Sequence, residues 1–179
     1  MSIFEVTGGK KLKGEINPQG AKNEALQVLC AVLLTPEKVT LSNIPDIVDV
    51  NKLIDLLRYL GVKVKKTGSD EYTFQADNVN VEFFNSPEFQ TKGSSLRGSI
   101  MIVGPLLARF GRGYIPKPGG DKIGRRRLDT HFTGFQNLGA KFEYDNKKEF
   151  YKVSAEKLKG AKMLLDEAIA KIENEENRR

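Results

Sequence analysis

The sequence is poor in the residues that bind metal ions or crosslink a chain. It contains one cysteine, Cys30, and one histidine, His131, so no disulfide bond can form within the chain and a dedicated zinc site is disfavoured. It also lacks any apolar run near the roughly 20 residues that span a membrane, and its first residues do not resemble a signal peptide. These absences favour a cytoplasmic protein, with Cys30 as a buried helix residue and not a nucleophile.

Positive charge is what the chain has in excess. Its 29 lysines and arginines outnumber its 23 acidic residues, and the net charge of +6 favours anionic partners without identifying them. The hydrophobic share of 39% is that of an ordinary globular protein. A length of 179 residues allows one domain with a substantial core, or part of a larger protein.

Hydrophobic spacing predicts a series of helix, strand, helix and hairpin that occurs twice. Both second helices are expected to end in a Leu-Gly pair, beginning at Leu60 and Leu138. The alternative is that short apolar motifs recur by chance. The elements are expected at 20–35, 38–45, 46–61 and 62–76, and again at 95–111, 112–120, 128–139 and 140–155.

This order predicts an α/β (α+β) chain with two repeat units, at about 22–95 and 96–157. A third unit would open with a strand within 158–168 and then stop, because residues 169–179 form a charged tail with no strand pattern. Residues 1–21 lie outside the repeat and read as a hairpin-like pair of short strands.

Two helix starts carry basic residues that core building does not require. Lys22 and Asn23 follow Gly20 where the first helix begins, and Arg97 stands at the start of a later apolar helix. Backbone N–H groups at a helix start attract anions, and a cation placed there favours an anion nearby. The alternatives are an exposed lysine in a capped turn and a surface arginine with a buried stem.

The densest cluster of polar residues is "PGGDKIGRRRLDTH" at 118–131. Its paired glycines permit a loop that approaches a ligand closely. Its three consecutive arginines can grip phosphate or carboxylate groups, and Asp121 could serve as a general acid. A solvated basic face and a structural role for His131 are the alternatives.

Several motifs of the sequence, taken together, resemble those of a known family. "GAKNEAL", "LSNIPDIVDV", "RGSIMIVGPLLARFG", "PGGDKIGRRRLDTHFTGFQNLGA" and "LKGAKMLLDEA" occur in order up to about residue 168. They are similar to the N-terminal part of the UDP-N-acetylglucosamine 1-carboxyvinyltransferases, in the enolpyruvyl transferase family. The resemblance implies an inside-out α/β barrel of βαβαββ units in each of two domains, with the substrates between them. It also implies that the strands of 1–21 pack on the second domain.

The resemblance assigns roles residue by residue. Lys22 and Asn23 match phosphoenolpyruvate contacts, and Arg97 matches an arginine near the sugar nucleotide. Asp121 occupies the position of the proton donor, where many members carry a cysteine that the epoxide fosfomycin alkylates. Arg126 also lies close to phosphoenolpyruvate. The uridine end of UDP-N-acetylglucosamine would be held by Arg126, Arg127, Leu128, Asp129 and Thr130.

The implied reaction transfers an enolpyruvyl group from phosphoenolpyruvate to the 3-hydroxyl of UDP-N-acetylglucosamine by addition and elimination. It requires no cofactor and no metal, and its partners are the two small substrates and the second domain of the same enzyme. No nucleic acid or membrane partner is expected.

The family continues past "LDEA" with a serine-containing turn that contacts the diphosphate, and here Ile169, Ala170 and Lys171 follow instead. The 179-residue chain alone is therefore expected to be an incomplete, inactive portion.

Three alternatives stay open. An RNA-contacting module of related fold would suit the basic charge, although the chain has no RNA-binding aromatic motif and its arginines form one cluster. The sister enzyme that acts on shikimate 3-phosphate is a closer chemical rival, but it fits the loop and arginine cluster less well. A non-catalytic fragment that associates through its charged tail is the third.

Overall fold

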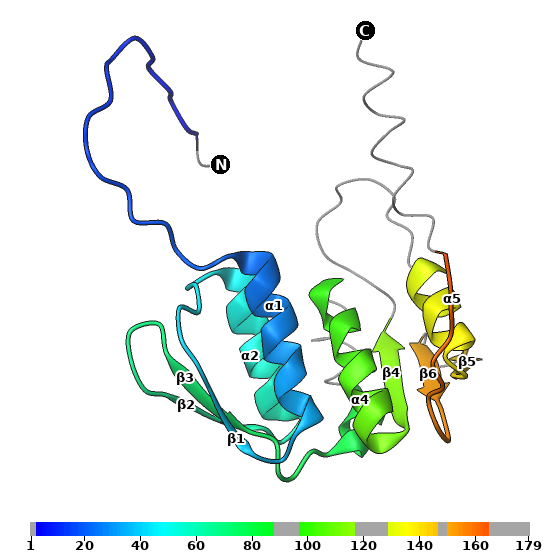
Figure 1. Cartoon of the computed structure of the whole chain (residues 1–179). Coiled ribbons are helices and arrows are strands. Elements are labelled where there is room, and N and C mark those ends of the chain that lie inside the picture. Colours follow the sequence, from blue (N-terminus) through cyan, green and yellow to red (C-terminus); the bar gives the residue numbers. More distant parts are fainter. Residues whose placement is uncertain (1–2, 88–96, 117–128, 147–149, 165–179) are drawn as a thin grey trace, which may run out of the picture.

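The computed structural model describes residues 3–87, 97–116, 129–146 and 150–164, and its main elements fall within the ranges predicted from the sequence (Figure 1). The first group is α1 (Lys22–Ala31), β1 (Lys38–Leu41), α2 (Val48–Tyr59), β2 (Lys63–Lys66) and β3 (Tyr72–Gln75). The second group is α4 (Val103–Phe110), β4 (Arg112–Pro116), α5 (Asp129–Asn137), β5 (Lys141–Asp145) and β6 (Phe150–Ser154). Short 3-10 helices are η1 (Val32–Leu34), η2 (Val81–Asn85) and η3 (Arg97–Ile102).

The strands form two small antiparallel sheets of three strands each. Their orders are β1-β3-β2 and β4-β6-β5, so in both sheets the last strand in sequence lies in the middle. Val39 and Val64 both stand opposite Phe74 in the first sheet, which places the three side chains on one face. The alternate positions Lys38, Gln75 and Lys63 point the other way, so the first sheet has one apolar face and one polar face.

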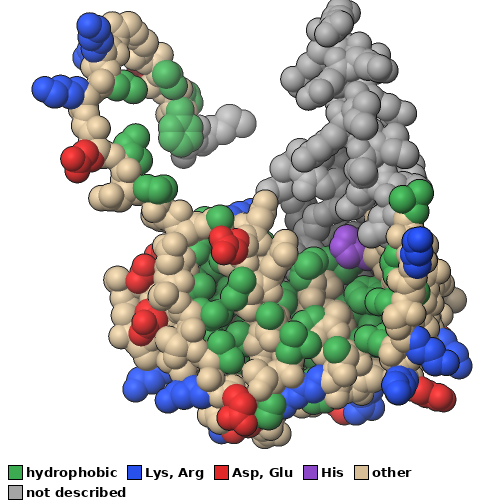
Figure 2. All heavy atoms as spheres, viewed as in Figure 1, with side chains coloured by type: hydrophobic (Ala, Val, Ile, Leu, Met, Phe, Trp, Pro, Cys, Tyr) green, Lys and Arg blue, Asp and Glu red, His purple; other side chains and the backbone are tan. Residues whose placement is uncertain are grey.

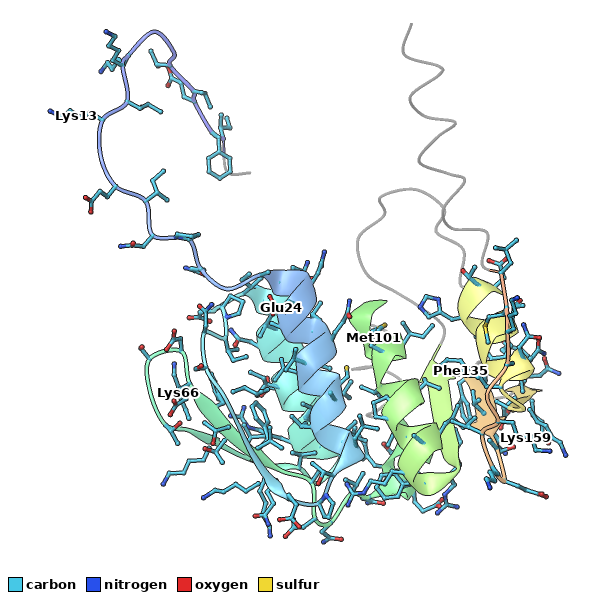
Figure 3. All side chains as sticks on the ribbon, in the orientation of Figure 1. Lys13, Glu24, Lys66, Met101, Phe135 and Lys159 are labelled. Atoms are coloured by element: carbon cyan, nitrogen blue, oxygen red, sulfur yellow. The ribbon has the colours of Figure 1, made fainter. Side chains whose placement is uncertain are left out.

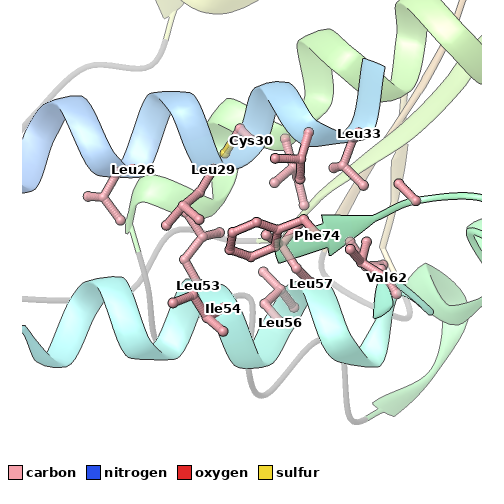
Figure 4. Packing of buried hydrophobic residues seen from close by; sticks show 14 of the residues in the cluster. Leu26, Leu29, Cys30, Leu33, Leu53, Ile54, Leu56, Leu57, Val62 and Phe74 are labelled. Carbon is pink, nitrogen blue, oxygen red and sulfur yellow. The ribbon is translucent and has the colours of Figure 1, made fainter. Parts of the chain in front are cut away.

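The larger core lies between the apolar face of the first sheet and helices α1 and α2. Leu29, Leu57 and Phe74 are completely buried there, and Cys30 is buried beside them (Figure 4). The apolar positions of α2 recur at helical spacing, so one side of the helix enters the core and the other stays in water. Helix α4 adds Leu106 to the same cluster, which joins the two groups of elements.

The second sheet packs on both faces. Tyr114 and Phe150 share one face and reach the larger core, where their rings meet edge to face at 5.4 Å. Val153, on the other face, belongs to a smaller cluster beneath α4 and α5. Partly buried aromatic rings of α5 and β5 complete this cluster.

Both Leu-Gly pairs end their helices as predicted. Gly61 follows α2 with a φ of 91°, and Gly139 follows α5 with a φ of 97°. Residues with a side chain rarely adopt this left-handed backbone conformation, so glycine lets the chain turn from helix into strand at both places.

Two predicted strands are absent from the described residues. A pair of short strands was predicted within 1–21, but residues 3–21 contain no strand, and residues 3–19 lie exposed in the segment that leads into α1 (Figure 1). A strand was predicted within 158–168 to open a third unit, and the described part, residues 158–164, contains none. A strand needs a neighbour for its backbone hydrogen bonds, and neither segment pairs with either described sheet.

Candidate functional site

Helix α1 begins with the two residues predicted to contact phosphoenolpyruvate, Lys22 and Asn23. The residue before them, Ala21, has an extended backbone and provides no side-chain cap for the first turn. The leading N–H groups of a helix have no partner within it, so this end is suited to accept an anion.

The position of the α1 start is fixed by a close approach at Gly20. A Cβ at this position would lie 2.1 Å from the carbonyl oxygen of Asn43, so no larger residue fits without a backbone shift. Asn43 itself has a φ of 58°, a conformation that asparagine tolerates better than most residues. The turn between β1 and α2 therefore packs directly against the chain that enters α1.

This packing brings Lys22 next to Asp49, in the first turn of α2. The Lys22 Nζ forms an ion pair with the Asp49 Oδ2, and both side chains remain partly exposed. Asp49 was not predicted as a site residue. The only signal in the sequence was an acidic residue at a second helix start, and its pairing with Lys22 depends on the tertiary packing of α1 against α2.

The helices that carry predicted site residues begin at one side of the molecule. Helices α1, α2 and η3 pack against one another, and Figure 1 shows that α1, α2, the η3–α4 run and α5 all start on the side where the N-terminal segment leaves. In Figure 3, the labelled Glu24 on α1 and Met101 on η3 lie at this same side. Lys22, Asn23 and the backbone of Arg97 are thereby brought to one edge.

Helix α5 supplies Asp129 and Thr130 in its first turn, at the same edge. Asp121, Arg126, Arg127 and Leu128 lie outside the described residues, as does the side chain of Arg97. Strand β4 ends at Pro116 and α5 begins at Asp129, so the described parts fix only where the segment between them is anchored.

One polar atom of α5 has no described partner. The Nδ1 atom of His131 is buried and makes no hydrogen bond within the parts of the chain that the structure describes. Buried polar atoms normally have a partner, so this nitrogen is an exception among the described residues. Its position, directly after Asp129 and Thr130, puts it at the border of the candidate site.

Beside the start of α1, the described residues line one small cavity. The cavity next to α1 has a volume of about 110 Å³ and lies between Gly20, Val28 and Asn43, whereas ligand pockets usually span roughly 300–1,000 Å³. A larger hollow of about 630 Å³ lies at the opposite end of α4, beside Gly111 and Leu158, and contains none of the predicted site residues. The candidate site is therefore defined by the helix starts that border it.

The described residues also limit other kinds of site. They contain no group of three or more His, Cys, Asp or Glu side chains placed to hold a metal ion. None of their helices is long and apolar enough to cross a membrane. Burial raises the pKa of the Cys30 thiol to about 12, which removes the thiolate that a nucleophilic cysteine needs.

Comparison with known proteins identifies the family. The family model described as EPSP synthase (3-phosphoshikimate 1-carboxyvinyltransferase) matches residues 6–172. The chain belongs to the EPSP synthase family. This match covers nearly the whole chain, including every predicted site residue.

Within the EPSP synthase family, the chain is most informatively compared with proteins named UDP-N-acetylglucosamine 1-carboxyvinyltransferase. The protein of Bacteroides fragilis is 62% identical over 168 residues, and that of Porphyromonas gingivalis is 56% identical over 168 residues. Each alignment covers 94% of this chain and 39% of the relative, so the chain spans about two fifths of the length of these relatives. The resemblance to the N-terminal part of these enzymes is confirmed.

Two solved structures, of an enolpyruvyl transferase and an EPSP synthase, confirm the fold. The enolpyruvyl transferase NikO of Streptomyces tendae matches with a TM-score of 0.62 at 18% identity, over 84% of this chain and 32% of that one. EPSP synthase of Acinetobacter baumannii matches with a TM-score of 0.61 at 17% identity, over 89% and 36%. The α/β arrangement with small antiparallel sheets is therefore an enolpyruvyl transferase fold.

Proposed function

We propose that the chain is part of an enzyme that transfers the enolpyruvyl group of phosphoenolpyruvate to the 3-hydroxyl of UDP-N-acetylglucosamine. The observation that carries this proposal is the 62% identity, over 94% of the chain, to a relative named for that reaction. The family description names the sister reaction on shikimate 3-phosphate. The sugar-nucleotide reaction is favoured because the relatives with 56–62% identity carry its name.

Each helix start would then serve one part of the substrates. Lys22 and Asn23 would hold phosphoenolpyruvate at the start of α1, where the N–H groups and the lysine both attract its phosphate. Arg97 would face the sugar nucleotide from the start of η3. The segment from Arg126 to Thr130 would hold its uridine end, with Arg126 also near phosphoenolpyruvate.

The chemistry would proceed by addition and then elimination. The sugar hydroxyl would release its proton to a base and attack C2 of phosphoenolpyruvate while Asp121 delivers a proton to C3, which gives a tetrahedral intermediate. Loss of phosphate and of a proton from C3 then restores the double bond. Lys22 and Arg126 would stabilise the charge that develops on the phosphate and carboxylate groups.

The proposal extends to the whole enzyme and its setting. The two sheets with their helices would be two units, at about 22–95 and 96–157, of an inside-out barrel, and residues 1–21 would pack on a second domain. The reaction would be the first committed step of peptidoglycan precursor synthesis in the cytoplasm, so cell shape and division would depend on it. Phosphoenolpyruvate and UDP-N-acetylglucosamine would suffice, without cofactor or metal.

Phosphate release from phosphoenolpyruvate and UDP-N-acetylglucosamine tests the proposal. We expect release by a protein extended to the length of the relatives and none by the 179-residue chain, since the site needs groups from both domains and must exclude water. Replacing UDP-N-acetylglucosamine with shikimate 3-phosphate should give no release. Release with shikimate 3-phosphate alone would refute the substrate assignment.

The role of Asp121 has its own test in the extended protein. Asp121→Asn should lose most turnover because an amide cannot donate the proton. The wild type should resist fosfomycin and Asp121→Cys should become sensitive, because a thiolate opens an epoxide far faster than a carboxylate does. Intact mass after incubation measures the adduct. An alkylated wild type, or an Asn variant with full turnover, would contradict the role of Asp121.

A further inference from the structure

The ion pair between Lys22 and Asp49 places an acidic residue where an anion is expected to bind. Lys22 is the first residue of α1, and Asp49 is the second residue of α2. Their contact joins the starts of two helices that pack side by side. A carboxylate repels an anion, so the presence of Asp49 beside this helix start calls for an explanation.

The neighbouring acidic residue of the same turn is already engaged. Asp46 accepts a hydrogen bond of 2.7 Å from the Asn51 side chain, which closes the turn into α2. Asp49 takes no part in that closure, and the cap residue Ile47 offers no side-chain hydrogen bond. Asp46 and Asp49 therefore have different partners although they lie three residues apart.

Helix electrostatics explain why Lys22 needs a partner. A cation in the first turn of α1 faces the positive end of the helix, whereas a carboxylate in the first turn of α2 is favoured there. The ion pair compensates Lys22 while no anion is present. Because Lys22 and Asp49 are 44% and 33% exposed, the pair is weak enough for a phosphate group to displace it.

We infer that Asp49 is a positioning residue for Lys22. In the empty site Asp49 holds the ammonium group at the shared edge of α1 and α2, and an incoming phosphate group takes its place. This inference deepens the proposed function and rests on it for the identity of the phosphate compound. The exchange itself requires only a phosphate group at Lys22.

The first readout is the order of the Lys22 side chain without ligand, measured by NMR of the 179-residue chain carrying ¹³C-labelled lysine. Lys22→Arg identifies the signal. We expect the Lys22 Cε signal of the wild type to show restricted motion, and Asp49→Asn to make it as mobile as the exposed lysines. Asp49→Glu should restore the restriction in part. Asp46→Asn removes the same charge from the same turn and should leave the signal unchanged.

The second readout is a titration of the same samples with inorganic phosphate. Asp49→Asn should bind phosphate at least about threefold more tightly than the wild type, since both the competing carboxylate and its repulsion are gone. Asp46→Asn should change the affinity by less than about twofold. Lys22→Ala should lose the site.

These readouts separate the inference from the proposed function. The positioning role is overturned if Asp49→Asn binds phosphate no more tightly than the wild type. It is also overturned if the Lys22 Cε signal changes neither in Asp49→Asn nor on addition of phosphate. If phosphate exchange follows the expected pattern while UDP-N-acetylglucosamine and phosphoenolpyruvate do not bind, the inference stands and the proposed substrates are wrong.

Discussion

Helices α2 and α5 hold the same place in the order of elements but differ in how deeply they are buried. Helix α2 contributes five buried residues to the larger core, whereas α5 contributes none. Phe132 and Phe135 of α5 rest instead against Phe142, with ring centroids 5.1 and 6.5 Å apart. The helix that carries Asp129 and Thr130 is thus held by partly exposed rings, and local opening should be easier there than at α2.

Apolar and basic side chains also lie on different parts of the molecular surface. Figure 2 shows hydrophobic side chains across the viewed face of α1 and α4, and Val28 and Leu34 are among the exposed apolar residues. Lys and Arg side chains gather along the lower edge of that view, away from the helix starts. The face with apolar exposure is suited to contact more protein, while the edge with the helix starts is suited to anions.

The largest loss of stability is expected when one core residue from each helix is replaced by alanine. Leu57→Ala removes a completely buried side chain from α2 and should lower the free energy of unfolding by about 2–5 kcal/mol. Phe135→Ala should cost less, about 1–2 kcal/mol, because part of this ring is already in water. Urea denaturation of the 179-residue chain measures both. A larger loss for Phe135→Ala would reverse the comparison.

The connection between the two groups of elements comes next. Arg109 of α4 donates hydrogen bonds to the carbonyl oxygens of Leu33, at 3.1 Å, and Ala76, at 2.8 Å. Arg109→Ala leaves these acceptors without their charged donor and should cost about 1.5–3 kcal/mol.

The matched control for Arg109 is Arg112→Gln, at a second arginine between the two groups. Arg112 forms an exposed ion pair of 3.0 Å with Glu82, and exposed pairs contribute at most about 1 kcal/mol. Separate unfolding transitions for the two groups in Arg109→Ala would show that Arg109 couples them. Equal losses in the two variants would contradict the structural role of Arg109.

The last prediction concerns the pH dependence of stability at Cys30 and tests whether water reaches the larger core. Its thiol has a pKa of about 12 in the folded chain and about 8.5 in an unfolded one. The unfolded state therefore loses its proton first, and stability must fall as the pH rises between these values. From about pH 8 to about pH 10 the loss should approach 2 kcal/mol. Cys30→Ala should lack this part of the slope, and identical slopes in both proteins would mean that water reaches the thiol.

Periodic sequence features predicted the elements well because local apolar spacing determines them. The helices around Leu29 and Leu57 and both hairpins were found in this way. The 3-10 helix η2 was missed, although Asn80 gives its cap by accepting a 3.1 Å hydrogen bond from the Glu82 N–H. The strands expected within 1–21 are absent from the described residues 3–21, because pairing depends on a partner strand that the local pattern cannot supply.

The candidate site was predictable only in part. Lys22 and Asn23 stand at a helix start that the sequence marks with Gly20, and the structure adds the reason, which is the contact of Gly20 with Asn43. Asp49 escaped prediction because it meets Lys22 only through helix packing. Asp121 and Arg126 remain predictions, since they lie outside the described residues.

An NMR titration of the 179-residue chain with UDP-N-acetylglucosamine tests whether these helix starts bind the sugar nucleotide. We expect weak binding, with amide shifts at the starts of α1, η3 and α5, and a loss of about 1–3 kcal/mol of binding free energy in Arg126→Ala. Shifts confined to the exposed lysines of the first sheet, such as Lys63 and Lys65, with RNA binding there that weakens steeply with salt, would favour the RNA-contacting alternative. Such a pattern, or identical titrations of the wild type and Arg126→Ala, would contradict a sugar-nucleotide site at these helix starts.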